Sequence, residues 1–262
     1  GNTLSDVMET YLEKIVGEDV YKYYGRQFPL LIKFLDINDK LSVQVHPDDQ
    51  VAAERYDSLG KAEIWYVMDA KPGAKMYCGF NREVSAQEFY DRCHAGTVDE
   101  ILNVIEPRKG DVIYITPGTV HAADGGLLIA EIQENSNVTY RVYDYGRLQN
   151  GKPRELHVEK AIDVTDTVPP TRGGDPDSAP VVNGDATEQA LCQCEFFKMD
   201  TIDVCGKHEL AVTEESFVSV LVLEGEGKVN ALDAKAGDSF FLPAGNYNAL
   251  IEGKIKVLIS TL

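Results

Sequence analysis

The sequence predicts a mainly β protein made of two similar β-rich halves, with a few helices before and within the first half. Three observations predict this class. Short β-rich runs fill most of the chain after residue 28, a stretch rich in Pro, Gly, Asp and Thr separates them, and a Gly-Asp motif followed by a strand and a Pro/Gly turn occurs once on each side of that stretch. The expected organisation is a helical segment at 1–27, a domain at 28–164, a linker or long loop at 165–190 and a second domain at 191–262.

The first element is an amphipathic helix, predicted for about residues 3–24. Thr3 or Ser5 is a candidate N-cap, and apolar residues follow at helical spacing: Leu4, Met8, Leu12 and Val16. Strands are then predicted at 30–35, 41–46, 63–68, 112–115, 127–132 and 138–143, interrupted by helical patterns at 48–56 and from 85 to about 105. Strands resume at Cys192, with a hairpin turn at 223–227.

Composition limits the partners of the chain. The 262 residues carry a formal net charge of −18, which repels nucleic acid and requires a local basic pocket for any anionic substrate. No apolar run approaches the ~20 residues of a membrane span, and no signal-peptide pattern opens the chain. Five cysteines without CxxC spacing fit a reducing compartment. We therefore expect a soluble, cytoplasmic protein that binds a small molecule, with no membrane or nucleic-acid partner.

The most informative stretch is residues 41–47, Leu-Ser-Val-Gln-Val-His-Pro. Side chains alternate across a strand, so Ser42, Gln44 and His46 share one face while the apolar residues take the other. An amide and an imidazole two residues apart, opposite an apolar face, predict the wall of a lined cavity. This pattern indicates a metal site.

Two copies of one motif relate the two halves. Gly110-Asp111 is followed by a strand and then by Pro117-Gly118-Thr119-Val120-His121, and Gly237-Asp238 is followed in the same way by residues 243–248, which end in Asn248. The motif resembles the second conserved motif of the cupin family, a small jelly-roll barrel that directs side chains into its interior. The resemblance implies two cupin jelly-roll barrels, a bicupin. Because the second copy ends in Asn248 without a His-x-His or Gln-x-His partner, we expect the second barrel to hold no metal.

Four residues of the first barrel are candidate metal ligands: Gln44, His46, Glu63 and His121. Two imidazole nitrogens and two oxygens suit a borderline divalent ion such as zinc, and so few protein ligands leave positions open for water or substrate. Gln44 and His46 come from one strand, Glu63 begins another, and His121 follows the Pro-Gly turn of a third. A barrel can bring these strands together, so one zinc ion per chain is predicted.

Four segments, taken in order, resemble the motifs of the type I mannose-6-phosphate isomerases, most closely the short bacterial members: 41–47, 60–66, 117–122 and 137–147. The resemblance is strong over residues 28–160 and looser in the C-terminal half. It implies zinc at the four candidate ligands and a catalytic role for Arg141. It also implies the reversible interconversion of mannose 6-phosphate and fructose 6-phosphate.

The residues present suit that reaction. Moving a proton between C1 and C2 through an enediol requires an acid/base group and stabilisation of the charge on the sugar oxygens, and zinc is a Lewis acid for the latter. Lys61 shares a strand face with Glu63 and is a candidate catalytic residue. Arg141 is always charged, so we expect it to stabilise charge and position the substrate rather than to abstract a proton.

The sequence leaves open which residues contact the substrate. Glu131 lies in an otherwise apolar strand; it either points inward, to bind a sugar hydroxyl or carry a proton, or points outward in a salt bridge. Ser42 is a further candidate for substrate binding. The phosphate candidates are Ser42, Lys61, Lys75, Arg141 and Arg147, among which spacing does not choose. The group that removes the C2 proton and the oligomeric state also stay open.

Two alternatives compete with the isomerase. A metal-dependent cupin oxygenase is disfavoured by Gln44, since oxygenases of this fold usually carry His-x-His. A non-catalytic sugar-binding cupin is disfavoured by the intact set of candidate ligands. It is favoured by the short N-terminus, because the related isomerases usually carry some tens of residues with a Trp-Gly motif before the first helix. If those residues complete a barrel, an exposed strand edge and reduced activity are expected.

Overall fold

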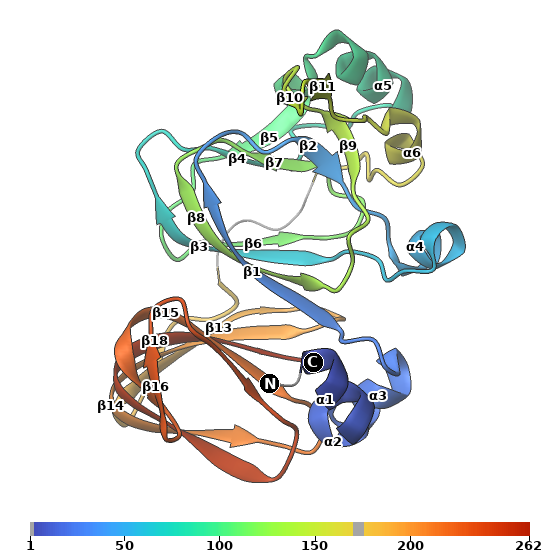
Figure 1. The fold of residues 1–262 in the computed structure, drawn as a ribbon. Helices are drawn as coiled ribbons and strands as arrows, with labels where there is room; N and C mark the ends of the chain where they lie inside the picture. The colour runs from blue at the N-terminus through green and yellow to red at the C-terminus, as the bar shows by residue number, and fades with distance from the viewer. Residues whose placement is uncertain (1–2, 170–175) are drawn as a thin grey trace. The chain divides into compact units, whose positions relative to one another are not determined.

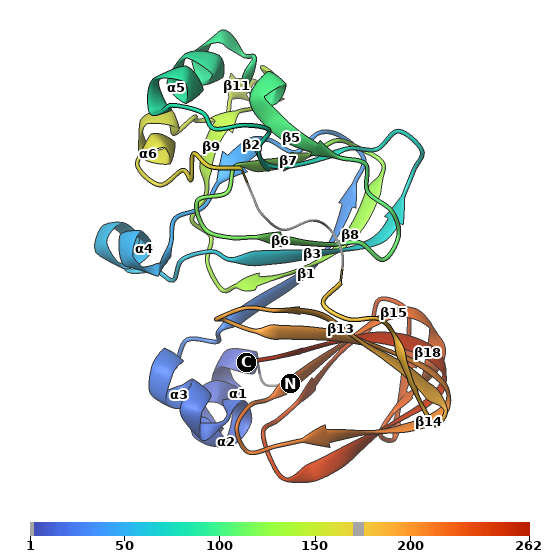
Figure 2. The same ribbon diagram turned by 180° about the vertical axis from the view of Figure 1, so that it is seen from behind.

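The computed structural model describes residues 3–169 and 176–262, and the chain divides into two units. One unit comprises residues 30–175, and the other comprises residues 1–29 together with 176–262. Strands dominate both units, so the predicted mainly β class is confirmed (Figures 1 and 2). The two-barrel description is not confirmed, because the sheets of the described residues are open rather than closed.

Two antiparallel sheets face each other in the unit of residues 30–175 (Figure 1). One has the strand order β1-β8-β3-β6, and the other has the order β5-β4-β7-β2-β9. The bounds are β1 Leu30–Ile37, β2 Val43–Val45, β3 Glu63–Ala70, β4 Met76–Phe80, β5 Leu102–Ile105, β6 Val112–Ile115, β7 His121–Ala123, β8 Leu127–Glu134 and β9 Tyr140–Tyr143. A short hairpin of β10 (Leu148–Gln149) and β11 (Lys152–Pro153) follows.

The helices of this unit begin at side-chain caps. The Asp48 carboxylate accepts the N–H of Val51 at 2.9 Å at the start of α4 (Asp49–Tyr56), and the Ser85 hydroxyl does the same for α5 (Ala86–Ala95). A 3₁₀ turn and strand β5 follow α5, so the helix expected to continue to about residue 105 is shorter than predicted. Helix α6 spans Val158–Ile162. Within the described residues, no helix has the length and apolar character of a membrane span.

Side chains alternate between the two faces of the strands in this unit, and they form two separate hydrophobic cores. One core lies between the two sheets and includes Trp65, Met76, Ile113, Ala123 and Ile129. The other lies on the outer face of the five-stranded sheet, where Val43, Val45, Ala122, Tyr140 and Val142 pack against Phe89 and Cys93 of α5 and Val158 and Ala161 of α6. Because Val43 and Val45 face outward, the residues that alternate with them face the interior, as the sequence predicted.

The other unit has one seven-stranded sheet with the order β12-β13-β14-β18-β15-β16, and β17 pairs with β15. The bounds are β12 Val181–Asn183, β13 Ala186–Gln193, β14 Lys198–Val212, β15 Val218–Val229, β16 Leu232–Lys235, β17 Ser239–Leu242 and β18 Tyr247–Thr261. Strands β12 and β13 begin within the segment predicted as a linker at 165–190, which is therefore not irregular throughout. Residues 170–175 of that segment lie outside the described residues.

Three short helices replace the single helix predicted at 3–24: α1 Leu4–Tyr11, α2 Glu13–Val16 and α3 Glu18–Tyr24. Of the two candidate caps, Thr3 and Ser5, Thr3 caps α1. Gly17 separates α2 from α3 with a φ of +102°, and a Cβ there would lie 2.2 Å from the carbonyl oxygen of Glu215. The carbonyl of Val16 also accepts the N–H of Phe217 at 3.0 Å. The N-terminal helices thus pack on C-terminal strands rather than forming a separate segment.

The two copies of the Gly-Asp motif form the same tight turn. In each copy the glycine has a positive φ, 96° for Gly110 and 93° for Gly237. In each copy the aspartate carboxylate also accepts the backbone N–H three residues earlier, at 2.7 Å for Asp111 and 2.9 Å for Asp238. The similarity between the halves therefore extends from sequence to backbone hydrogen bonding.

A row of glycines crosses the long strands of the seven-stranded sheet. Gly206 of β14 is paired with Gly253 of β18, which is paired with Gly227 of β15. A Cβ at Gly227 would lie 2.0 Å from the carbonyl oxygen of Glu252. Close approach of backbones at this row excludes side chains, which is a common reason for glycine inside strands.

We predict that Gly227→Ala lowers the free energy of unfolding by about 1–3 kcal/mol, since the added methyl group must displace backbone. Urea denaturation followed by circular dichroism measures the change. The control is Gly245→Ala, whose new Cβ would meet only the Tyr247 ring at 3.0 Å. Equal stability of the two variants would contradict the steric role of the glycine row.

Candidate active site

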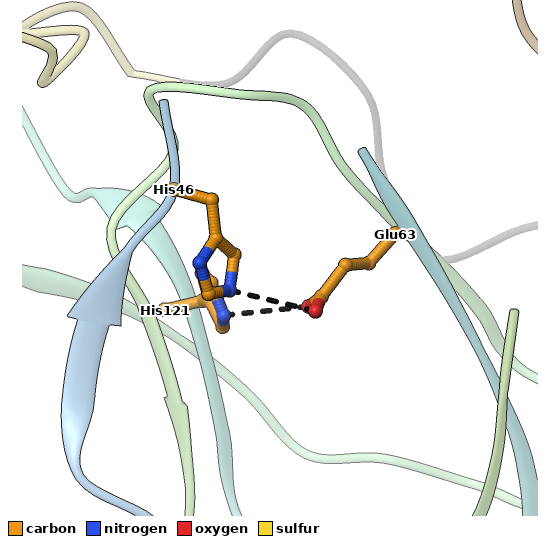
Figure 3. A group of neighbouring side chains, drawn as sticks. All are labelled: His46, Glu63 and His121. Atoms are coloured by element: carbon orange, nitrogen blue, oxygen red, sulfur yellow. Dashed lines mark ion pairs between the residues drawn. The ribbon is translucent and has the colours of Figure 1, made fainter. Parts of the chain in front are cut away.

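Three of the predicted ligands, His46, Glu63 and His121, converge inside the unit of residues 30–175 (Figure 3). His46 follows β2, Glu63 begins β3 and His121 begins β7, and all three are almost completely buried. Their ligand atoms lie within 4.8 Å of one another. The Glu63 oxygens are 3.4 Å from His46 Nε2 and 3.5 Å from His121 Nε2. A single ion placed between these atoms would contact all three side chains.

Backbone carbonyls set the orientation of both imidazole rings. His46 Nδ1 lies 3.0 Å from the carbonyl oxygen of Val138, and His121 Nδ1 lies 2.9 Å from that of Thr119. A carbonyl only accepts, so each Nδ1 carries the proton and donates. Each Nε2 then presents its lone pair toward Glu63. The hydrogen bond from Nδ1 to a backbone carbonyl is the contact that metal-binding histidines usually make with the ring nitrogen that does not bind the metal.

The electrostatics fit a cation at this point. Burial lowers the pKa of His46, and it lowers the pKa of His121 to about 3, so both rings are neutral at pH 7. Burial alone would raise the pKa of Glu63, but the ammonium of Lys61, 2.7 Å from its Oε1, favours the ionised carboxylate and lowers that pKa.

Three buried atoms of the group lack a hydrogen bond. Glu63 Oε1, Glu63 Oε2 and His121 Nε2 have no hydrogen-bond partner among residues 3–169 and 176–262, although Oε1 forms an ion pair with Lys61. Two neutral imidazoles, a carboxylate and such orphaned atoms are what a divalent metal of the zinc type requires. The residues present therefore fit the predicted metal.

Gln44 lies at the right place on β2 to join this group. It is paired in register with His121 of β7 on one side and with Arg141 of β9 on the other. Its neighbours Val43 and Val45 pack in the outer core, which leaves the Gln44 amide on the interior face. Its assignment as the fourth ligand stays a prediction.

Lys61 lies beside the ligand group, although it precedes β3 and does not share a strand face with Glu63 as the sequence predicted. The side chain is 8% exposed, and its Nζ lies 2.7 Å from Glu63 Oε1 and 3.3 Å from His46 Nε2. A cation is thus held next to the position that a metal would take. Its catalytic role is a prediction that the contacts make chemically reasonable.

Glu131 points into the protein, which decides between the two orientations left open by the sequence. It is 4% exposed, and its Oε2 accepts the indole N–H of Trp65 at 2.9 Å. Its Oε1 accepts from Lys33 Nζ at 2.7 Å. Burial raises the pKa of Glu131, and the negative charge of Glu63 raises it further. The carboxylate is inward and also salt-bridged, a combination that the sequence analysis did not consider.

The sequence analysis missed Lys33. This residue lies in β1 directly opposite Glu131 in β8, and it also donates to Gln133. A lysine within the apolar run of residues 30–35 was the signal that could have found it, because a charge on the inner face of such a strand needs a buried partner. Lys33 therefore extends the polar group within one sheet, from Glu63 of β3 past Glu131 of β8 to β1.

A second basic group gathers at the end of β9. Arg141 Nε donates to the hydroxyl of Ser42 at 3.3 Å, and Ser42 is 5% exposed. Arg147 and Arg154 both donate to the carboxylate of Asp144, at 3.2 and 2.8 Å. Burial would raise the pKa of Asp144, but the two guanidinium groups hold it below its usual range. Arg154, which directly follows the hairpin of β10 and β11, was not predicted, because no strand or motif pattern marks it, while Lys75, just before β4, is exposed.

Comparison with known proteins agrees with this geometry. Residues 1–82 match the family model of the phosphomannose isomerase type I catalytic domain, and residues 187–262 match that of the mannose-6-phosphate isomerase cupin domain. Mannose-6-phosphate isomerase ManA of Bacillus subtilis is 35% identical over 271 residues, which cover 100% of this chain and 82% of ManA. The chain belongs to the type I phosphomannose isomerase family. The predicted resemblance is confirmed.

Further members of the family support the assignment. A mannose-6-phosphate isomerase of Streptococcus mutans is 35% identical, over 89% of this chain and 74% of that protein. The crystal structure of the mannose 6-phosphate isomerase of Bacillus subtilis superposes with a TM-score of 0.88, at 35% identity, over 100% of this chain and 82% of that chain. A phosphomannose isomerase of Salmonella typhimurium, 17% identical with a TM-score of 0.76 over 99% of this chain and 85% of that chain, shares the fold.

In the cupin-domain match, Asn248 takes the place that His121 has in the first copy of the motif. The Asn248 amide donates to Glu209 Oε2 at 2.9 Å. An amide and a carboxylate from neighbouring strands therefore lie where the first copy supplies an imidazole. That this half holds no metal stays a prediction from sequence.

The single tryptophan of the chain offers a direct test of metal binding. The Trp65 ring lies 5.5 Å from the His121 ring, so a divalent ion at His121 is expected to change tryptophan emission. Titrating Zn²⁺ or Co²⁺ into metal-stripped protein should give a saturable change at one ion per chain. In His121→Ala the affinity should fall by more than about 100-fold, beyond the range of outer-shell changes. His94→Ala, an exposed helix residue, is the control, and unchanged binding in His121→Ala would refute the site.

Proposed function

We propose that this chain is a zinc-dependent aldose–ketose isomerase that interconverts mannose 6-phosphate and fructose 6-phosphate through an enediol. The main support is the buried group of His46, Glu63 and His121, with Lys61 in contact, in a chain whose full-length relatives carry this activity in their names. Membership of the family supports the reaction, and the side chains at the site are of the kinds that its chemistry requires.

The metal would be held by His46, Glu63 and His121, with Gln44 as the proposed fourth ligand. Bound zinc would act as a Lewis acid on the sugar carbonyl and on the oxygens of the enediolate. Both imidazoles are neutral at this buried position, since burial lowers their pKa values. The chain therefore supplies ligands that stay competent at neutral pH.

Proton movement between C1 and C2 needs groups beside the metal position. The Lys61 ammonium can donate to a sugar oxygen, which neutralises charge that develops in the enediolate. The raised pKa of Glu131 moves this carboxyl toward the range in which acid/base catalysis is effective. We assign Lys61 as a catalytic cation and Glu131 as the group that contacts a sugar hydroxyl and can carry a proton.

The phosphate requires local positive charge, because the chain as a whole carries −18. Arg141 and Ser42 supply a guanidinium and a hydroxyl that already contact each other. Arg147 and Arg154 are close enough to influence the pKa of Arg141, and Asp144 fixes both. We propose that this end of β9 binds the phosphate and stabilises the charge of the enediolate, with Arg141 as the residue nearest the reacting atoms.

A coupled assay tests the function. Formation of fructose 6-phosphate from mannose 6-phosphate should be measurable, should stop after treatment with a chelator and should return with Zn²⁺ because the proposed site is metal-dependent. Activity restored by iron but not by zinc would refute zinc as the metal of this site. Absence of turnover with zinc restored would refute the proposed reaction.

Arg141→Ala separates charge stabilisation from metal binding. We expect kcat to fall about 10²–10³-fold, the cost of removing one group that stabilises a transition-state anion, while the zinc content stays at one per chain. Metal analysis beside steady-state kinetics measures both. Arg55→Ala, which removes a surface ion pair with Asp163, is the matched control and should retain activity. Full activity in Arg141→Ala would remove Arg141 from the mechanism.

A further inference from the structure

Trp65 lies where the polar site meets the apolar core. It is the only tryptophan of the chain, is 1% exposed and shares the interior face of β3 with Glu63. Its ring belongs to the core between the two sheets, with Val67, Ile113 and Ile129. Close packing on all sides fixes the plane of the ring and therefore the direction of its N–H.

That N–H donates to Glu131, the carboxyl group proposed to act on the sugar. Trp65 and Glu131 are directly paired across β3 and β8, and the indole Nε1 donates to Glu131 Oε2 at 2.9 Å. The other oxygen, Oε1, accepts from Lys33, whose side chain is 33% exposed and ends in a freely rotating ammonium. A rigid donor on one oxygen and an adaptable donor on the other mean that Trp65 sets the orientation of the carboxylate.

The same ring contacts the metal ligands. Its plane meets the His121 ring edge to face, at 5.5 Å between centroids and 85° between planes. His121 in turn lies 3.5 Å from Glu63. One side chain thus touches both a ligand of the proposed metal and the carboxyl group proposed to act on the sugar, and it fixes the spacing between them.

We propose that Trp65 is a positioning residue, which holds the Glu131 carboxylate through its indole N–H at a fixed place relative to His121. This inference rests on the proposed function, because it gives Glu131 a role in turnover. Trp65 itself touches neither substrate nor reacting atoms. Its loss would leave phosphate binding at the arginine end of β9 intact and would act mainly on the chemical step.

The first experiment is Trp65→Phe in the zinc-loaded protein. Phenylalanine keeps an aromatic ring in the core and removes the donor, so kcat should fall about 10–100-fold, the usual effect of an outer-shell partner, with KM nearly unchanged. Ile113→Val trims the same core without removing a donor and should keep wild-type kcat. Zinc content is measured for each variant. Wild-type kcat in Trp65→Phe, or an equal loss in Ile113→Val, would overturn the positioning role.

The second experiment does not depend on turnover. Unfolding free energies of Trp65→Phe, Glu131→Ala and the double variant form a cycle that should show a stabilising coupling between the two side chains. Glu131→Gln should also shift the emission of Trp65, because it removes the charge next to the indole N–H. No coupling and no shift would overturn the proposal while leaving the isomerase reaction untouched. Coupling without any wild-type turnover would instead refute the proposed function and, with it, the catalytic consequence for Glu131.

Discussion

The ionised carboxylate of Glu63 is the group on which the arrangement of the site depends. A charge that is 1% exposed is very unfavourable unless cations or hydrogen-bond donors surround it. Here the compensation comes from Lys61, two residues before Glu63 and 2.7 Å from it, and from a position that two imidazole nitrogens share. The partners come from three strands, so the local fold has to bring β2, β3 and β7 together.

The fold meets this requirement by keeping the backbone of the ligand-bearing segments hydrogen-bonded. The N–H of Gly118 donates to the carbonyl of His46 at 2.9 Å, which ties the turn before β7 to the end of β2. Gly118 has a φ of +86°, and a Cβ there would lie 2.8 Å from the carbonyl oxygen of Val164. Glycine is therefore required at this turn. The turn that the sequence showed as a Pro-Gly motif is what delivers His121 to the site.

The interior between the two sheets is divided into an apolar part and a polar part along its strands. Glu63, Trp65 and Val67 lie in this order on one face of β3: Glu63 is a proposed ligand, and Trp65 and Val67 belong to the hydrophobic core. On β8, Glu131 and Ile129 do the same. Polar side chains therefore occupy this interior face only where hydrogen-bond or ionic partners are available to them. The tryptophan at the boundary satisfies both sides, because its ring is apolar and its N–H is a donor.

Local features were predictable from the sequence, namely which residues share a strand face, the Pro-Gly turn before His121 and two candidate caps of the first helix. These follow from a period of two and from turn chemistry, which act over a few residues. His46, Glu63, His121 and Lys61 were found in this way. Three features became visible only in the folded chain: Glu131 points inward, Lys33 reaches it, and the N-terminal helices pack on C-terminal strands. Those outcomes depend on the pairing of strands far apart in the chain, which no local pattern encodes.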